Sequence, residues 1–84
     1  MMKITPEVTP EVTMMLVVME GDMARNEIMA ALGLKDEKHF REHYQQPAIR
    51  SGLIEMTVPD RPRSRLQRYR LTQRGRAFRR RHLE

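Results

Sequence analysis

Residues 48–75 decide the fold of this chain, and they read AIRSGLIEMT (48–57), VPDRPRSRLQ (58–67) and RYRLTQRG (68–75). The first part predicts a helix that ends at Gly52 and leads into a strand over residues 53–57, whose apolar side chains alternate with polar ones. After a loop rich in Pro and Arg, alternation resumes over residues 66–71 and predicts a second strand, with Tyr69 and Leu71 facing inward and Arg68 and Arg70 outward. Thr72 then has the chemistry of a helix N-cap. The order is therefore helix, strand, basic loop, strand, helix.

The start of the chain carries a duplicated helix-capping signal. Thr9-Pro10-Glu11 repeats Thr5-Pro6-Glu7, and each unit offers an N-cap Thr, a Pro at the first helical position and an acid in the first turn. Only Thr9 can begin a helix, because Pro10 would break a helix begun at Pro6. The residues expected to face the core are spaced i, i+3, i+4, i+7, and they are Val12, Met15, Leu16 and Met19.

Two further helices are expected before the strands. One spans about residues 24–32 and ends at Gly33, with Leu34 reaching the core. Its N-cap is open, since Ala24 is a poor cap and Asp22 is the alternative. Its expected core residues are Ile28, Ala31 and Leu32.

A third helix follows an N-cap at Asp36 and carries Phe40 and Tyr44 on its inner face. Pro47 falls within or just after it. We therefore expect a kink or break at Gln45-Gln46 and a further turn through residue 51.

These elements predict an α+β fold, a winged helix-turn-helix with a three-helix core, a two-stranded β-hairpin wing and a C-terminal helix over about residues 73–81. Eighty-four residues make one domain. We place it at residues 9–82, after a linker over residues 1–8, and interpret residues 83–84 as a tag remnant. The longest apolar run, Met14 to Met19, is far shorter than the roughly 20 residues that span a bilayer. With no signal peptide, we expect a cytoplasmic protein without membrane contact.

The net charge of +5 conceals a strong asymmetry. Residues 1–60 contain six Lys or Arg and ten Asp or Glu, whereas residues 61–82 contain ten Arg and no acid. A one-sided arginine block indicates a polyanionic partner, and Arg forms forked contacts with phosphate. A solvated basic tail, or an arginine bias that reflects genome composition, is the alternative.

No constellation in the chain predicts catalysis. There are no cysteines, and neither Ser51 nor Ser64 has a plausible base beside it. His39 and His43 are spaced i, i+4 but lack the Glu after the first His that zincin-type sites require. We interpret them as surface or groove-facing residues and expect no metal, cofactor or small-molecule ligand.

The candidate DNA contacts form two groups. The outer face of the expected third helix would read base edges, because Gln and Arg are suited to that task, although nearby acids make this helix almost neutral. Its candidates are Lys35, Lys38, His39, Arg41 and Gln45. The wing and basic tail would contact phosphates through Arg61, Arg63, Arg65, Arg68, Arg70, Arg74 and Arg76. The wing loop has two prolines but no apolar anchor, so a disordered loop is the alternative.

Several segments together resemble a known family over residues 5–77. They are the Thr-Pro-Glu-Val repeat, Gly33-Leu34-Lys35-Asp36, His39-Phe40-Arg41, Pro47-Ala48, Gly52-Leu53-Ile54-Glu55-Met56-Thr57 and Gln67-Arg68-Tyr69-Arg70-Leu71-Thr72. The chain resembles the C-terminal winged-helix domain of bacterial Fic-like and Schlafen/AlbA-type ATP-binding proteins, described as RecG-related ATP-dependent DNA helicases or transcriptional regulators. It departs from the expected pattern at Ala24 and at the acidic Glu42-His43 pair.

The resemblance implies a regulatory module at the C-terminus of a larger protein whose ATP-binding or catalytic part lies elsewhere. We therefore expect a module that binds double-stranded DNA and is not itself an enzyme. A winged helix for protein interaction or self-association, without DNA contact, is the alternative. The sequence gives no DNA target site, activity of the parent protein or oligomeric state.

Overall fold

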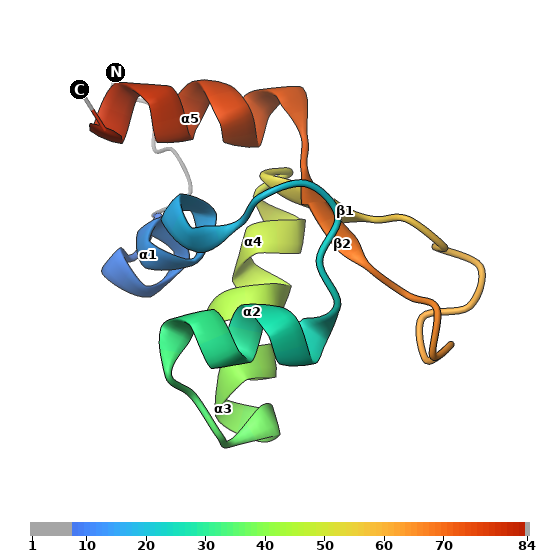
Figure 1. The fold of residues 1–84 in the computed structure, drawn as a ribbon. Coiled ribbons are helices and arrows are strands. Elements are labelled where there is room, and N and C mark those ends of the chain that lie inside the picture. The colour runs from blue at the N-terminus through green and yellow to red at the C-terminus, as the bar shows by residue number, and fades with distance from the viewer. Residues whose placement is uncertain (1–7, 84) are drawn as a thin grey trace.

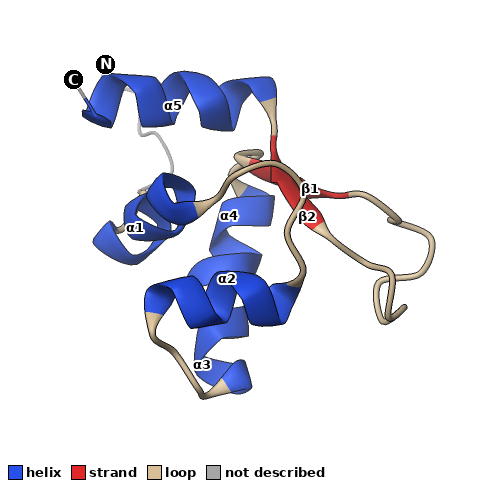
Figure 2. Ribbon diagram, in the orientation of Figure 1, coloured by secondary structure: helices blue, strands red, loops and turns tan. Residues whose placement is uncertain are grey.

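A computed structural model describes residues 8–83, which form five α-helices, two β-strands and one π-helical turn. The helices gather on one side of a short hairpin (Figures 1 and 2). In chain order the elements are α1 (Pro10–Val18), α2 (Arg25–Leu32), α3 (Glu37–Phe40), the π-helical η1 (Arg41–Gln45), α4 (Gln46–Arg50), β1 (Ile54–Met56), β2 (Tyr69–Leu71) and α5 (Gln73–Leu83). The predicted fold class is confirmed. Most of the expected linker, and Glu84, lie outside the described residues.

Helix α1 begins where the duplicated capping signal predicts. The Thr9 hydroxyl oxygen accepts a hydrogen bond from the Val12 amide at 3.2 Å, which satisfies one of the free donors of the first turn. All four residues predicted to face inward are buried, namely Val12, Met15, Leu16 and Met19. This helix therefore supplies the centre of the core.

Helix α2 is capped and oriented differently from the prediction. Ala24 is the N-cap, and the Glu27 carboxylate accepts from its amide at 2.8 Å, so the Asp22 alternative is wrong. Ala31 is exposed and Met29 is buried. The buried face of α2 is therefore rotated from the predicted one. It includes Ile28 and Met29, and Leu32 is partly buried beside them. Gly33 ends the helix with a φ of 74°, as predicted.

Residues 37–50 form one continuous helical column, here called the recognition helix after the role that the sequence predicts for it. Asp36 caps it by accepting from the Lys38 and His39 amides at 3.0 and 3.2 Å. The predicted break at Gln45-Gln46 is wrong, because both residues keep right-handed helical angles. The backbone instead widens into a π turn, in which the Gln46 amide donates to the Arg41 carbonyl. This wider turn accommodates Pro47, which lacks an amide hydrogen and would crowd the preceding turn of an α-helix.

The hairpin is shorter than predicted but has the predicted faces. Ile54 pairs with Leu71 and Met56 with Tyr69 in antiparallel register, and both residues of β2 that were predicted to face inward are buried. The second strand was expected from residue 66, but it begins at Tyr69. Leu66 is 75% exposed because the chain turns outward before the ladder starts. Tyr69 also pairs with Met23 on its other side.

Helix α5 closes the domain by packing against α1 (Figure 1). Thr72 caps it, since its hydroxyl accepts from the Gly75 amide at 3.0 Å and donates to the Gly52 carbonyl at 2.6 Å. The cap thereby also ties α5 to the end of the recognition helix. Within residues 8–83, no helix is long and apolar enough to cross a membrane.

Candidate nucleic-acid interface

The wing loop, residues 57–68, is held in shape by one buried polar side chain. Gln67 is 6% exposed, and its amide oxygen accepts from the Val58 amide at 3.0 Å. Its amide nitrogen donates to the carbonyls of Val58 and Arg61. The side chain thus acts as the anchor that the sequence did not reveal. In the sequence, the signal for this contact is a single Gln that directly follows a loop with two prolines.

Three of the predicted wing arginines are open to an anionic partner. Arg61, Arg63 and Arg65 are exposed, and none has a carboxylate partner within the described part of the chain. The two arginines nearer β2 are different. Arg68 pairs with Glu27 at 3.2 Å, and Arg70 pairs with Glu55 at 2.8 Å; these neighbouring carboxylates offset their charge.

The acids near the recognition helix keep its net charge close to neutral, as the sequence indicates. Two of these acids interact with nearby groups in the structure. Asp36 caps the helix, and the Glu37 carboxylate lies 3.6 Å from the Arg25 guanidinium. The predicted contacts that are exposed and lack an ion-pair partner among the described residues are Lys35, Lys38, His39 and Arg41. These four side chains can reach a ligand.

Gln45 lies in a different environment from the one that the sequence predicts. It was expected on the outer face, but it is 9% exposed, and its Oε1 has no hydrogen-bond partner in the part of the chain that the structure describes. The π turn widens the helix at this point, so the surface order that a regular 3.6-residue repeat predicts no longer applies after Arg41. This Gln cannot reach a base edge without a change in its surroundings.

The structure separates the wing from the basic tail. Helix α5 crosses the end of the domain opposite α3 (Figure 1), so Arg74 and Arg76 do not lie beside the wing tip. Arg76 also donates to the Leu71 carbonyl at 3.1 Å. Arg79, which the sequence did not single out, reaches inward and donates to the carbonyl oxygens of Leu16 and Met19 at 3.4 and 2.6 Å.

The two histidines of the recognition helix lie together, with ring centroids 4.6 Å apart. His39 also makes an edge contact with Tyr44, at 5.8 Å between centroids. Among the residues described, no group of three or more His, Cys, Asp or Glu side chains could hold a metal ion. The side chain of His82 lies outside the described set.

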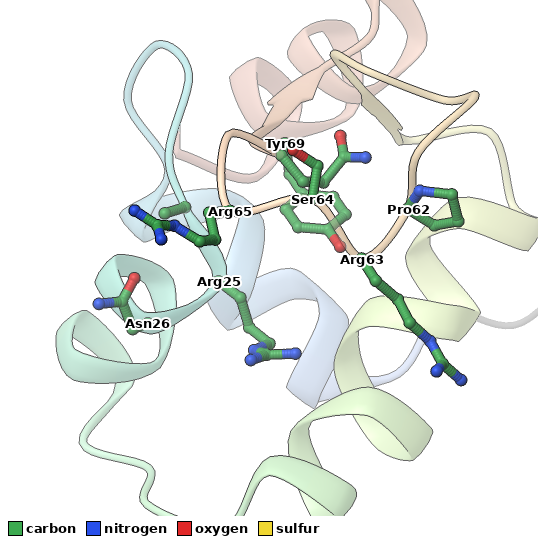
Figure 3. Close-up of a pocket in the computed structure, with 9 residues that line it drawn as sticks. Arg25, Asn26, Pro62, Arg63, Ser64, Arg65 and Tyr69 are labelled. Atoms are coloured by element: carbon green, nitrogen blue, oxygen red, sulfur yellow. The ribbon is translucent and has the colours of Figure 1, made fainter.

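A cleft separates the wing from the rest of the domain, and Tyr69 lines its wall. Figure 3 shows Arg25 and Arg63 extending on either side of the Tyr69 ring, in the direction in which its hydroxyl points. Burial raises the pKa of Tyr69 above its ordinary value of 10.0, and the positive charge of Arg25 opposes that change. The cleft therefore combines a phenol with several cations.

Comparison with known proteins places this fold. A family model described as "Filamentation induced by cAMP protein Fic-like, C-terminal domain" matches residues 10–72. A solved structure of a Fic family protein from Desulfovibrio desulfuricans G20 superposes with a TM-score of 0.73 and is 43% identical in sequence. The match covers 80% of this chain and 21% of that protein, so the chain spans about a fifth of its relative's length. No curated protein matches.

Proposed function

Because the chain belongs to the family of Fic-like C-terminal domains, we propose that it is a DNA-binding winged-helix module of a larger protein. The observation that carries this proposal is the ordered wing. Gln67 fixes the loop, and three unpaired arginines, Arg61, Arg63 and Arg65, are exposed on it. Exposed arginines on a preformed loop are suited to phosphate contacts, because the guanidinium fork matches phosphate oxygens.

In this proposal the wing contacts the DNA backbone while the recognition helix enters the major groove. The helix presents Lys35, Lys38, His39 and Arg41, and of these Arg41 is the best suited to read guanine, because its fork can bond two acceptors. The arginines of α5 lie at the other end of the domain (Figure 1). They contribute long-range attraction rather than direct contacts.

The module supplies binding and carries no catalytic step of its own. A parent protein with helicase-like or transcription-regulating activity of the RecG-related kind would hold its ATP-binding or catalytic part outside these residues. The module would then recruit that part to a duplex.

The salt dependence of duplex binding tests this proposal. Each neutralised phosphate contact contributes a slope of roughly −0.9 in log affinity against log salt. Replacing Arg61, Arg63 and Arg65 together by Ala should flatten the slope by about 2 to 3 units and weaken all duplexes alike. Fluorescence anisotropy with a labelled duplex at several salt concentrations measures it.

A matched variant controls for net charge. Replacing Arg74, Arg80 and Arg81, which are exposed on α5, by Ala removes an equal number of positive charges from a surface away from the wing. It should flatten the slope by less than half as much. Equal slopes for the two triple variants would show that the wing is not a specific contact surface.

A second candidate function is protein interaction without DNA contact. It is favoured by Met14 and Val17, which are 53% and 41% exposed on the outer side of α1; Met is common on partner-binding surfaces. If no duplex binds even at low salt, this function becomes the better one. Replacing both residues by Ser should then abolish association with the parent protein's remaining part.

A further inference from the structure

The cleft beside the wing brings together a set of residues of which the proposed DNA binding uses only a part. It consists of two adjoining hollows of about 540 and 320 Å³, which share Arg25, Pro62, Arg63 and Tyr69 among their lining residues. Among the residues that the structure describes, no Asp or Glu lines either hollow. The volumes fall in the range of roughly 300–1,000 Å³ that is typical of small-molecule sites.

Three arginines from separate elements line the larger hollow. Arg25 comes from α2, Arg41 from η1 and Arg63 from the wing loop. Arg41 and Arg63 have no ion-pair partner among the described residues, and Arg25 meets only the exposed Glu37 at 3.6 Å. A hollow lined by cations of one sign raises the local concentration of anions.

Two polar groups on the same hollow are also without partners. The Gln45 side chain is 9% exposed and lines the cleft, and its Oε1 has no hydrogen-bond partner among the described residues. A buried amide oxygen without a hydrogen bond destabilises the fold. Half a turn of the amide exchanges its oxygen and nitrogen, so the same side chain can donate to an anion. The Tyr69 hydroxyl, a second donor, has no hydrogen-bond partner within residues 8–83.

From this arrangement we infer that the cleft binds a small phosphorylated molecule through Arg25, Arg41 and Arg63, with Gln45 and Tyr69 as further donors. Guanidinium forks match phosphate oxygens two at a time. Three forks around one hollow suit a group with more than one negative charge, such as a phosphate monoester or a diphosphate. The sequence predicted no small-molecule ligand, because the five residues come from four separate segments of the chain.

Occupancy of the cleft has a consequence that rests on the proposed DNA-binding function. Arg41 is the base reader of that proposal, and Arg63 is one of its phosphate contacts. A phosphorylated ligand that engages both arginines competes with a duplex for them. The small molecule would therefore antagonise DNA binding.

Titration of the 84-residue chain with inorganic pyrophosphate, without DNA, tests the site directly. We expect one equivalent to bind, with chemical-shift changes concentrated at the Arg63 side chain, the Tyr69 ring and the Gln45 amide. Replacing Arg41 or Arg63 by Ala should each weaken binding about tenfold, because each removes hydrogen bonds to a charged group. Both side chains are exposed, so the variants should fold.

The control is Arg80→Ala, which removes an equal charge from the exposed surface of α5 and should change the affinity less than about twofold. A loss for Arg80→Ala as large as that for Arg63→Ala would show attraction by net charge alone and overturn the inference. Shifts spread over α5 instead of the cleft would do the same.

Gln45→Met separates binding from folding. It removes the unsatisfied amide while keeping a similar length, so it should raise the thermal midpoint and also weaken pyrophosphate binding. A raised midpoint with unchanged affinity would exclude Gln45 from the site.

Competition with DNA is measured last, by adding pyrophosphate or a nonhydrolysable sugar phosphate to a preformed complex at constant ionic strength. Release of the duplex by the phosphates, but not by an equivalent ionic strength of chloride, supports the antagonism. Binding of pyrophosphate without release of the duplex would overturn the antagonism, whereas the inferred phosphate site would still stand. Failure of the duplex to bind at all would count against the proposed function, and the titration without DNA would still decide the cleft.

Discussion

At the scale of single residues, a close approach between a helix and a strand explains one glycine. Gly75 lies in the first turn of α5 and is buried against the backbone of Leu53. A β-carbon built at Gly75 would overlap the Leu53 carbonyl oxygen and lie 3.0 Å from its carbonyl carbon. The obstacle is backbone rather than a flexible side chain, and the same carbonyl accepts from the Thr72 amide at 3.0 Å. Only Gly permits the strand and helix to meet here.

Gly75→Ala should therefore destabilise the fold by about 1–3 kcal/mol, the range for an overpacked core. The sign is informative, because Gly→Ala in an unhindered helix stabilises by roughly 0.4–1 kcal/mol. Urea denaturation followed by circular dichroism measures the difference. A gain in stability would mean that α5 does not dock on the Leu53 backbone.

Tyr69 makes the stability of the domain dependent on alkaline pH. Burial raises the pKa of its phenol above 10.0 in the folded state, so folding favours the neutral form. The stabilisation that results is complete below pH 10 and is lost as the pH rises through the higher folded-state pKa. The free energy of unfolding should fall above about pH 10.

Tyr69→Phe should reduce this alkaline loss while leaving the neutral-pH stability nearly unchanged, because the hydroxyl has no partner within the described residues. Urea denaturation between roughly pH 8 and 11.5 compares the two proteins. An alkaline loss of equal size in the Phe variant would assign it to other groups.

At the scale of elements, the wing is a loop that a single side chain converts into a fixed structure. Gln67 satisfies both backbone groups of Val58 and the carbonyl of Arg61. At the base of the loop, the Thr57 amide donates to the Arg68 carbonyl at 2.9 Å, and the Arg68 amide donates to the Thr57 hydroxyl at 3.2 Å. Beyond this pair the loop contains short-range turns, such as Arg61 to Val58 and Ser64 to Arg61, at 3.1 and 3.0 Å. Gln67 is therefore the side chain that joins the two sides of the loop above its base.

Gln67→Ala should therefore release the wing, because it leaves the Val58 amide without its partner. We expect a loss of about 1–3 kcal/mol and faster amide exchange at Val58, with little change in the helices. Gln73→Ala is the matched control, since Gln73 is exposed at the start of α5. Unchanged exchange at Val58 would show that the loop is held by other contacts.

The recognition helix shows how an element can keep its predicted residues and change its geometry. Phe40 and Tyr44 are buried with their rings stacked at 5.8 Å, as an i, i+4 spacing predicts. The π turn of residues 41–45, which includes Tyr44, places Gln45 inside the protein and leaves Gln46 exposed. The adjustment at Pro47 thus determines which of two adjacent glutamines is available to a ligand.

At the scale of the whole molecule, Arg79 joins the last helix, α5, to the first helix, α1. Its guanidinium donates to the Met19 and Leu16 carbonyls at the end of α1, where a helix has free acceptors and a cation is favoured. Helix α5 therefore belongs to the cooperative unit, although its sequence reads as a basic tail. Arg79 is one of the ten arginines of residues 61–82, and its role is structural.

Arg79→Met keeps the aliphatic stem but removes both hydrogen bonds, and it should lower stability by about 1.5–3 kcal/mol. Arg80→Met, on the exposed side of the same helix, should be nearly neutral. Hydrogen exchange should quicken in α5 and at the end of α1 for the first variant only. Similar exchange in both variants would mean that α5 is held by apolar contacts alone.

The sequence by itself determined the element order, the caps at Thr9, Asp36 and Thr72, and the inward faces of α1 and β2. Those features depend on local spacing and on hydrogen bonds between residues a few positions apart, which a linear pattern records. It also indicated which segment carries the positive charge.

Only the tertiary structure decided which polar groups are free to bind. The pairing of Arg68 with Glu27 joins residues 41 positions apart, and the inward turn of Gln67 and Arg79 depends on carbonyls supplied by other segments. The cleft likewise draws Arg25, Arg41 and Arg63 from three elements. Composition counts these charges, but only the folded chain brings each one to a partner or leaves it exposed, because Coulombic and hydrogen-bond interactions depend on distance in space.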